Sequence, residues 1–138
     1  MRLVQKSLNT QMWNEVTKEH IKGHPGCDGD LYWPDECEEQ RGHCWIERAK
    51  CTKCSYLSKK FKLYTEVARD GPGRRAAAPN VGLAACLTQT SIGPDTARKL
   101  ALSMNTPAPS YRTLHDTTCR IAETIIDACE SDMEDKRQ

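Results

Sequence analysis

Apolar side chains in the first twenty residues recur at a helical spacing. They are Leu3, Val4, Leu8, Met12, Trp13 and Val16. Most steps between them are three to five residues, which places the side chains on one face of a helix. The pattern predicts an amphipathic helix, and the Gly23-His-Pro-Gly26 run that follows predicts its end.

The next part of the chain has the pattern of short strands. Residues 31–33 are a short aromatic run, and residues 35–42 form an acidic loop closed by a glycine. In residues 56–67 four apolar side chains occupy odd-numbered positions, whereas Lys60 and Lys62 occupy even ones. This alternation predicts a strand with one packed face and one basic, solvated face.

The second half of the chain has a helical composition. After a Gly/Pro-containing linker at residues 70–75, three segments have helical spacing: residues 80–89, residues 95–103 and the segment from Ser110 onward. The third segment follows a strict three/four spacing and carries the strongest helical signal. Asn80 follows a proline and is expected to cap the first of these helices.

Paired cysteine and histidine residues indicate a metal site in the strand region. Cys51 and Cys54 have the two-residue gap that lets one tight turn present two ligands to zinc. The second pair is most economically His24 and Cys27, because the Pro-Gly between them favours a turn. Two such pairs flanking a hairpin predict a zinc ribbon. Its Zn²⁺ ligands would be His24, Cys27, Cys51 and Cys54.

Other ligands are available in the same region. Cys37, His43 and Cys44 lie between the two pairs, and His20 lies one helical turn before His24. We expect Cys44 to be a buried strand residue, because a free cysteine packs like a small apolar side chain. We expect Cys37 to be exposed, because its loop is acidic.

The chain has eight cysteines, but the N-terminus lacks the apolar run of a signal peptide. No stretch approaches the roughly 20 apolar residues of a membrane span. We therefore expect an intracellular, reduced protein rather than a disulfide scaffold. A redox dithiol at Cys51 and Cys54 is the alternative to metal, but a thioredoxin-like βαβ context is missing. The cysteines expected to pack on helices are Cys86, Cys119 and Cys129.

Charge is segregated along the chain, although the formal net charge is only +1. Residues 28–39 contain six acidic residues and no lysine or arginine, whereas residues 41–75 contain ten basic residues and three acidic ones. A local excess of this kind suggests a surface for a polyanion. The 38% hydrophobic content supports a modest core, which a bound metal often supplements.

The three predicted helices, with a glycine-containing turn and a proline-broken turn between them, are a helix-turn-helix candidate. A plain three-helix bundle is the alternative. In a helix-turn-helix, the start of the third helix meets base edges, and the basic strand and linker, including Arg69, would meet phosphates. The expected DNA-binding residues are Lys59, Lys60, Lys62, Arg74, Arg75, Tyr111, Arg112 and His115.

Several longer runs resemble the N-terminal region of Mutator-like transposases, most closely those abundant in marine invertebrates. The runs are Gly26-Cys-Asp-Gly-Asp-Leu-Tyr-Trp-Pro34, Arg41-Gly-His-Cys-Trp-Ile-Glu-Arg-Ala-Lys-Cys-Thr-Lys-Cys-Ser-Tyr56, Lys59-Lys-Phe-Lys-Leu-Tyr64, Leu87-Thr-Gln-Thr-Ser-Ile-Gly93 and Asn105-Thr-Pro-Ala-Pro-Ser110. The resemblance implies a zinc-binding, DNA-binding front end followed by an RNase H-like nuclease. That nuclease needs about a hundred further residues and metal-binding carboxylates, so we expect this chain to be non-catalytic.

These observations predict a small α+β protein in which a zinc-ribbon sheet packs with a helix-turn-helix half. The expected divisions are an N-terminal helix at 1–23, the ribbon at 24–70 and the helical subdomain at 76–138. The expected function is zinc-stabilised binding of double-stranded DNA, in the nucleus, with no membrane association and with a homodimer or a transposase as a further partner. The alternatives are a protein–protein adaptor built on the ribbon and a fragment of an active transposase.

Overall fold

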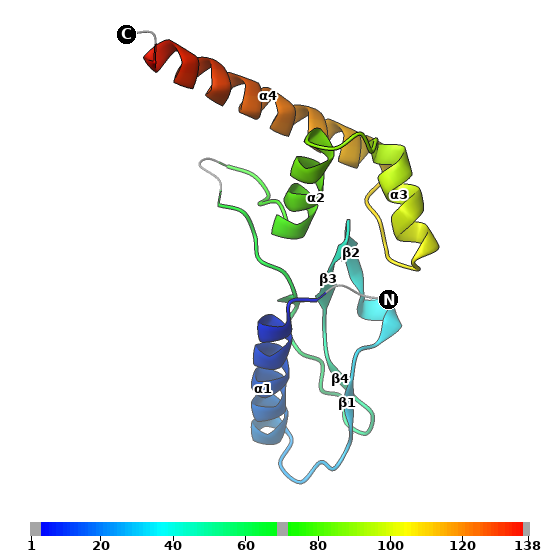
Figure 1. Cartoon of the computed structure of the whole chain (residues 1–138). Coiled ribbons are helices and arrows are strands. Elements are labelled where there is room, and N and C mark those ends of the chain that lie inside the picture. Colours follow the sequence, from blue (N-terminus) through cyan, green and yellow to red (C-terminus); the bar gives the residue numbers. More distant parts are fainter. Residues whose placement is uncertain (1–3, 69–71, 137–138) are drawn as a thin grey trace.

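The computed structural model describes residues 4–68 and 72–136, which form four α-helices and small antiparallel sheets (Figure 1). This confirms the predicted α+β class. In chain order the elements are α1 (Lys6–Gly23), β1 (Leu31–Tyr32), the 3₁₀ helix η1 (Asp35–Cys37), β2 (Glu39–Arg41), β3 (Cys44–Glu47), β4 (Lys50–Cys51), β5 (Phe61–Lys62), α2 (Ala78–Thr88), α3 (Pro94–Ser103) and α4 (Tyr111–Asp135).

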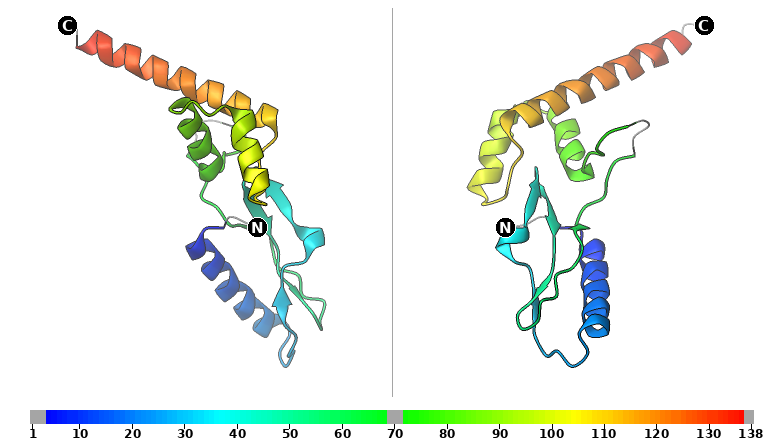
Figure 2. Two further views of the ribbon diagram at one scale, coloured as in Figure 1. Left: turned by 45° about the vertical axis from the view of Figure 1, so that its right-hand side comes forward. Right: turned by 180° about the vertical axis from the view of Figure 1, so that it is seen from behind.

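Helix α1 lies alongside the strands and shares a core with them (Figures 1 and 2). Met12 and Val16 of α1 pack with Ala49 and Leu63, and all four side chains are buried. The rings of Trp13 and Trp33 stack with centroids 5.6 Å apart around this cluster. The helical stripe in the sequence therefore identified the face of α1 that packs on the sheet region.

The strands form two small sheets. In the first, β1 pairs with β4 so that Leu31 lies opposite Cys51. The second has the order β2-β3-β5. Strands β2 and β3 meet in a tight hairpin, where Arg41 lies opposite Cys44 and Gly42 has a φ of 65°. A positive φ at this turn favours glycine.

The strand expected over residues 56–67 is much shorter than its alternation suggested, because only Phe61–Lys62 forms β5. Leu63 still donates to the carbonyl of Trp45 in β3, but from Thr65 onward the backbone pairs with residues 76–78 instead of with the sheet. The amide of Val67 donates to the carbonyl of Ala76, and that of Ala78 donates to Thr65. The packed face is correspondingly limited: Leu63 is buried, but Leu57 and Val67 are exposed.

Helices α2, α3 and α4 make the other end of the molecule, where α4 packs on both α2 and α3. Their core contains Ala84, Leu87 and Leu114. Ser110 caps α4, since its side-chain oxygen accepts from the amide of Thr113. Asn80 does not cap α2: the helix begins at Ala78, before Asn80, and no side chain caps it.

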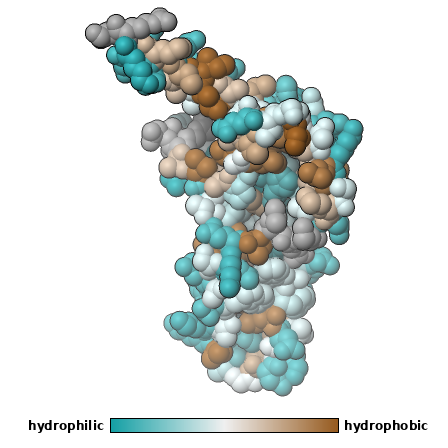
Figure 3. Space-filling model, viewed as in Figure 1, coloured by the Kyte–Doolittle hydropathy of each residue, from teal (hydrophilic) through white to brown (hydrophobic). Residues whose placement is uncertain are grey.

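The molecule is elongated, with α1 and the first sheet at one end and α4 across the other (Figure 2). Apolar patches are visible on the helical end in the space-filling view (Figure 3). The expected ribbon boundary at residue 70 lies outside the described residues, and the division into 1–23, 24–70 and 76–138 stays a prediction. Within the described ranges, no helix has both the length and the apolarity needed to cross a membrane.

Candidate functional site

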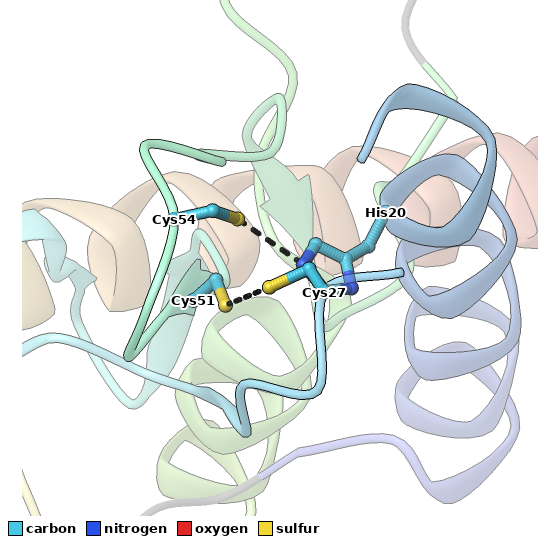
Figure 4. A group of neighbouring side chains, drawn as sticks. All are labelled: His20, Cys27, Cys51 and Cys54. Carbon is cyan, nitrogen blue, oxygen red and sulfur yellow. Dashed lines mark hydrogen bonds between the residues drawn. The ribbon is translucent and has the colours of Figure 1, made fainter. Parts of the chain in front are cut away.

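Four side chains from three separate segments converge beside the first sheet (Figure 4). The imidazole of His20 and the thiols of Cys27, Cys51 and Cys54 each offer one ligand atom, and these atoms all lie within 4.8 Å of one another. Nε2 of His20 is 3.2 Å from Sγ of Cys54, and Sγ of Cys27 is 3.7 Å from Sγ of Cys51. We call this group the His/Cys cluster.

The fold places each member of the cluster. His20 follows Met12 and Val16 at four-residue steps on the buried face of α1, so packing of α1 on the core aims the imidazole at the sheet. Cys51 lies on β4, opposite Leu31 of β1. Gly29 leaves room for it: a Cβ at residue 29 would lie only 2.5 Å from the sulfur of Cys51.

The distances within the cluster fit a tetrahedral metal. Zinc–sulfur bonds of about 2.3 Å at tetrahedral angles separate two sulfurs by about 3.8 Å. The 3.7 Å between the sulfurs of Cys27 and Cys51 matches that separation, and it is far longer than the roughly 2.0 Å of a disulfide. One imidazole and three thiols form a donor set that suits a thiophilic cation. The cluster could therefore hold a metal ion.

Local hydrogen bonding favours a thiolate in the cluster. The backbone N–H of Cys54 points to the sulfur of Cys51 and lowers the pKa of the Cys51 thiol to about 6, and the N–H of Lys53 adds to this effect. Burial acts in the opposite direction on Cys54 and raises its pKa. A thiolate held by two backbone amides is the form that binds metal.

The structure brings Cys27, Cys51 and Cys54 together as expected, but it places His20 rather than His24 with them. The backbone amide of His24 caps α1 by donating to the carbonyl of His20, 2.9 Å away. Its ring lies 5.9 Å from that of His20, centroid to centroid, and outside the cluster. The spacing rule favoured His24, whereas the buried stripe of α1 carried the signal for His20.

The remaining candidate ligands lie elsewhere. Cys44 is buried in β3, as predicted, and burial raises its pKa to about 11. His43 is buried in the β2–β3 turn, and Cys37 is half-buried in η1 rather than exposed. The expectation that the helical cysteines pack in the core is wrong, since Cys86, Cys119 and Cys129 are all exposed.

Most of the residues expected to contact DNA already have an acidic neighbour. Lys59 pairs with Glu15, Lys60 with Glu39 and Lys62 with Glu66. Arg74 also reaches Glu39, and Arg112 lies 3.8 Å from Asp116. Exposed pairs of this kind are weak and are screened by salt, so they leave the cations available to a competing anion. Arg69 lies outside the described residues.

The start of α4 has two distinct faces. Tyr111 and His115 are exposed, and their rings stack with centroids 5.7 Å apart. Thr113, Thr117 and Arg120 lie roughly half a turn away around the helix and line a cleft with Arg74 and Arg75. Tyr111 and His115 therefore do not share one surface of α4 with the expected linker arginines.

The cleft also contains two arginines that sequence reasoning did not include. Arg41 enters it from the end of β2, and Arg120 enters it from the third turn of α4. Arg41 opens the basic stretch of residues 41–75 but was not singled out within it, and Arg120 has no basic neighbour in the sequence. Only the fold brings Arg41, Arg74, Arg75 and Arg120 together.

Comparison with known proteins agrees with the resemblance noted in the sequence. A family model described as Mutator-like transposase matches residues 1–138, which is the whole chain. No curated protein and no solved structure matches the chain. The narrower likeness to marine invertebrate versions stays a prediction. The chain belongs to the Mutator-like transposase family.

Proposed function

We propose that this chain is a zinc-stabilised domain that binds double-stranded DNA for a Mutator-like transposase. The observation that carries the proposal is the His/Cys cluster, in a chain that matches the transposase family along its whole length. A transposase acts on DNA ends, and a metal-clamped scaffold is a common way to present DNA-binding side chains. In this proposal the nuclease activity resides outside the chain.

Zinc is the metal that the donor set favours. Structural zinc sites use four nitrogen and sulfur ligands and add directly to folding free energy, which matters where the apolar clusters are small. The test is elemental analysis of protein purified without chelator, followed by thermal unfolding with and without a chelator. One zinc per chain and a lower Tm after chelation are expected. Absence of stoichiometric zinc would remove this part of the proposal.

Exposed polar side chains at the start of α4 support DNA binding. Arg112 has 92% of its side chain exposed, and Tyr111 and His115 are exposed beside it. Duplex binding, followed by fluorescence anisotropy over a series of salt concentrations, tests the proposal. Released counterions give a slope of about −0.9 in log K against log salt for each phosphate neutralised. A chain that binds no duplex at low salt lacks the proposed function.

A second function, docking of a protein partner, is favoured by a different observation. A cavity of about 310 Å³ opens between α2 and α3 and is lined almost entirely by apolar side chains, among them Leu83, Ile92 and Met104. Leu100, also in the lining, is 55% exposed. Apolar grooves of this kind accept side chains of a partner. Such binding would change little with salt, which separates it from DNA binding.

Self-association and a nuclear location belong to the same proposal. All residues of α4 from 123 onward are exposed, including Ile125, Ile126 and Met133. A second copy or another part of a transposase is the partner that we expect to cover them. Sedimentation of the zinc-loaded protein measures self-association. Imaging of a tagged chain measures its nuclear location.

A further inference from the structure

The cleft beside α4 gathers four arginines from three parts of the chain. It has a volume of about 570 Å³, which is within the range of ligand sites in proteins. Its arginines come from β2 (Arg41), from the segment before α2 (Arg74 and Arg75) and from α4 (Arg120). Of the described residues that line it, none is acidic.

The charges around the cleft are incompletely neutralised. Glu39, beside the cleft, accepts from Arg41, Lys60 and Arg74, so one carboxylate faces three cations. These contacts hold the pKa of Glu39 below its usual range, and the hydrogen bond from Arg41 contributes most to this effect. Within residues 4–68 and 72–136, Arg75 and Arg120 have no carboxylate partner.

Two further features suit a tetrahedral oxyanion. Nε of Arg41 is buried and has no hydrogen-bond partner in the described part of the chain. The hydroxyl-bearing side chains of Ser110, Thr113 and Thr117 share the lining with the arginines. Guanidinium groups bind phosphate in a two-pronged fashion. The hydroxyls of Ser110 and Thr113 bond to each other and that of Thr117 donates to the carbonyl of Thr113, so a hydroxyl would have to rotate to donate to a phosphate.

We propose that this cleft is a phosphate-binding site that grips the DNA backbone beside α4. The assignment of the phosphate to DNA rests on the proposed function, whereas the chemistry of the site does not. Backbone phosphates fix the position and orientation of a DNA-binding element without reading sequence. The site therefore anchors α4 from the face opposite Tyr111 and His115, and Glu39 competes with the phosphate for Arg41 and Arg74.

The test uses the full chain, three variants of the cleft and its surroundings, and one control variant. Arg120→Gln and Arg75→Gln each remove one cation from the cleft, and Glu39→Gln removes the competing carboxylate. Arg98→Gln, on α3, is the matched control, because it makes the same chemical change at a helix position outside the cleft. Duplex affinity is measured by anisotropy against salt, and binding of a mononucleotide and of inorganic phosphate is measured by calorimetry.

The expected result has opposite signs for the two kinds of variant. Arg120→Gln and Arg75→Gln weaken duplex binding roughly 10-fold and reduce the salt slope by about one unit, equally for all sequences. Glu39→Gln tightens binding, an effect that a merely structural role of Glu39 would not produce. Arg98→Gln leaves the affinity within about twofold of the wild type.

The outcomes also separate the site from the overall function. If the wild-type chain binds duplex and both cleft variants match Arg98→Gln, the proposed site is wrong while the proposed function stands. If no duplex binds but mononucleotide or phosphate does, and Arg120→Gln abolishes that binding, the phosphate site stands and its ligand is a free phosphate compound. If neither duplex nor phosphate binds, both proposals fail.

Discussion

Asn80 and Arg41 join the two ends of the molecule. The side-chain amide of Asn80, in the first turn of α2, donates to the carbonyl of Arg41, 2.7 Å away at the β2–β3 turn. Its oxygen also accepts from the amide of His43, 2.9 Å away. A side chain expected to cap its own helix instead satisfies two backbone groups of a distant hairpin.

Replacing Asn80 should destabilise the contact between the helical end and the hairpin. Asn80→Ala leaves the carbonyl of Arg41 and the amide of His43 without these partners in a partly buried setting, which costs about 1–3 kcal/mol. Asn80→Asp keeps the acceptor for His43 but sets a carboxylate oxygen in place of the donor against the carbonyl of Arg41, so its cost should be at least that of alanine. Urea unfolding measures both. An alanine variant as stable as the wild type would contradict the role assigned to this side chain.

The identity of the histidine ligand is tested by a matched pair. His20→Ala should lower zinc affinity by more than the roughly 10–100-fold that loss of a supporting residue costs, because it removes a ligand. His24→Ala, four residues further on, should leave the affinity close to the wild type. Competition with a chromophoric chelator reports both values. A larger loss of zinc affinity in His24→Ala than in His20→Ala would show that His24 is the ligand.

Gly29 offers a way to disturb the cluster without changing a ligand. In Gly29→Ala the new methyl group meets the sulfur of Cys51 at 2.5 Å, so the turn at residues 51–54 must shift. We expect a loss of about 1–3 kcal/mol in stability and weaker zinc binding. In the control Gly23→Ala, the new methyl group meets nothing within 4 Å. Equal zinc affinity for the two variants would show that Gly29 is not packed against Cys51 in solution.

Alkylation should sort the cysteines by exposure and pKa. Cys86, Cys119 and Cys129 are exposed and should react first. Because burial raises the pKa of Cys44 to about 11, only about one molecule in a thousand carries its thiolate at pH 8, and labelling should rise only at higher pH. Cluster cysteines such as Cys51 should be protected until a chelator removes the metal. Mass spectrometry locates the labels, and early labelling of Cys44 would contradict its burial.

Base reading and phosphate contact predict different behaviour for two exposed cations. Arg112→Ala should relax sequence preference by about 1–3 kcal/mol at the position it reads. Lys60→Ala should lower the affinity for all duplex sequences alike and reduce the salt slope by at most about one unit. The effect can be smaller than one unit because Lys60 also pairs with Glu39. Binding to a panel of duplexes separates the two. An equal loss of affinity for all duplexes in Arg112→Ala would show that Arg112 contacts the DNA backbone and not a base.

Local patterns in the sequence determined the helices and most of the cluster. The stripe through Met12 and Val16 predicted both the helix α1 and its buried face. Cys51 and Cys54 are close in space because they are close in sequence, so their spacing alone predicted the turn that joins them. Ser110 lies just before a strict three/four repeat, and it caps α4. These features depend on interactions within a few residues, which is the range that a sequence pattern reports.

Contacts between distant segments were decided only by the tertiary structure. His20 rather than His24 completes the cluster because the rotation of α1 against the sheet aims the imidazole, and that rotation depends on packing around Leu63. Strand β5 is short because from Thr65 onward the backbone pairs with residues 76–78 instead of with the sheet. Arg41 and Arg120 meet in one cleft although they lie 79 positions apart in the sequence. Packing of this kind depends on all contacts of the core together, so no pattern within a few residues encodes it.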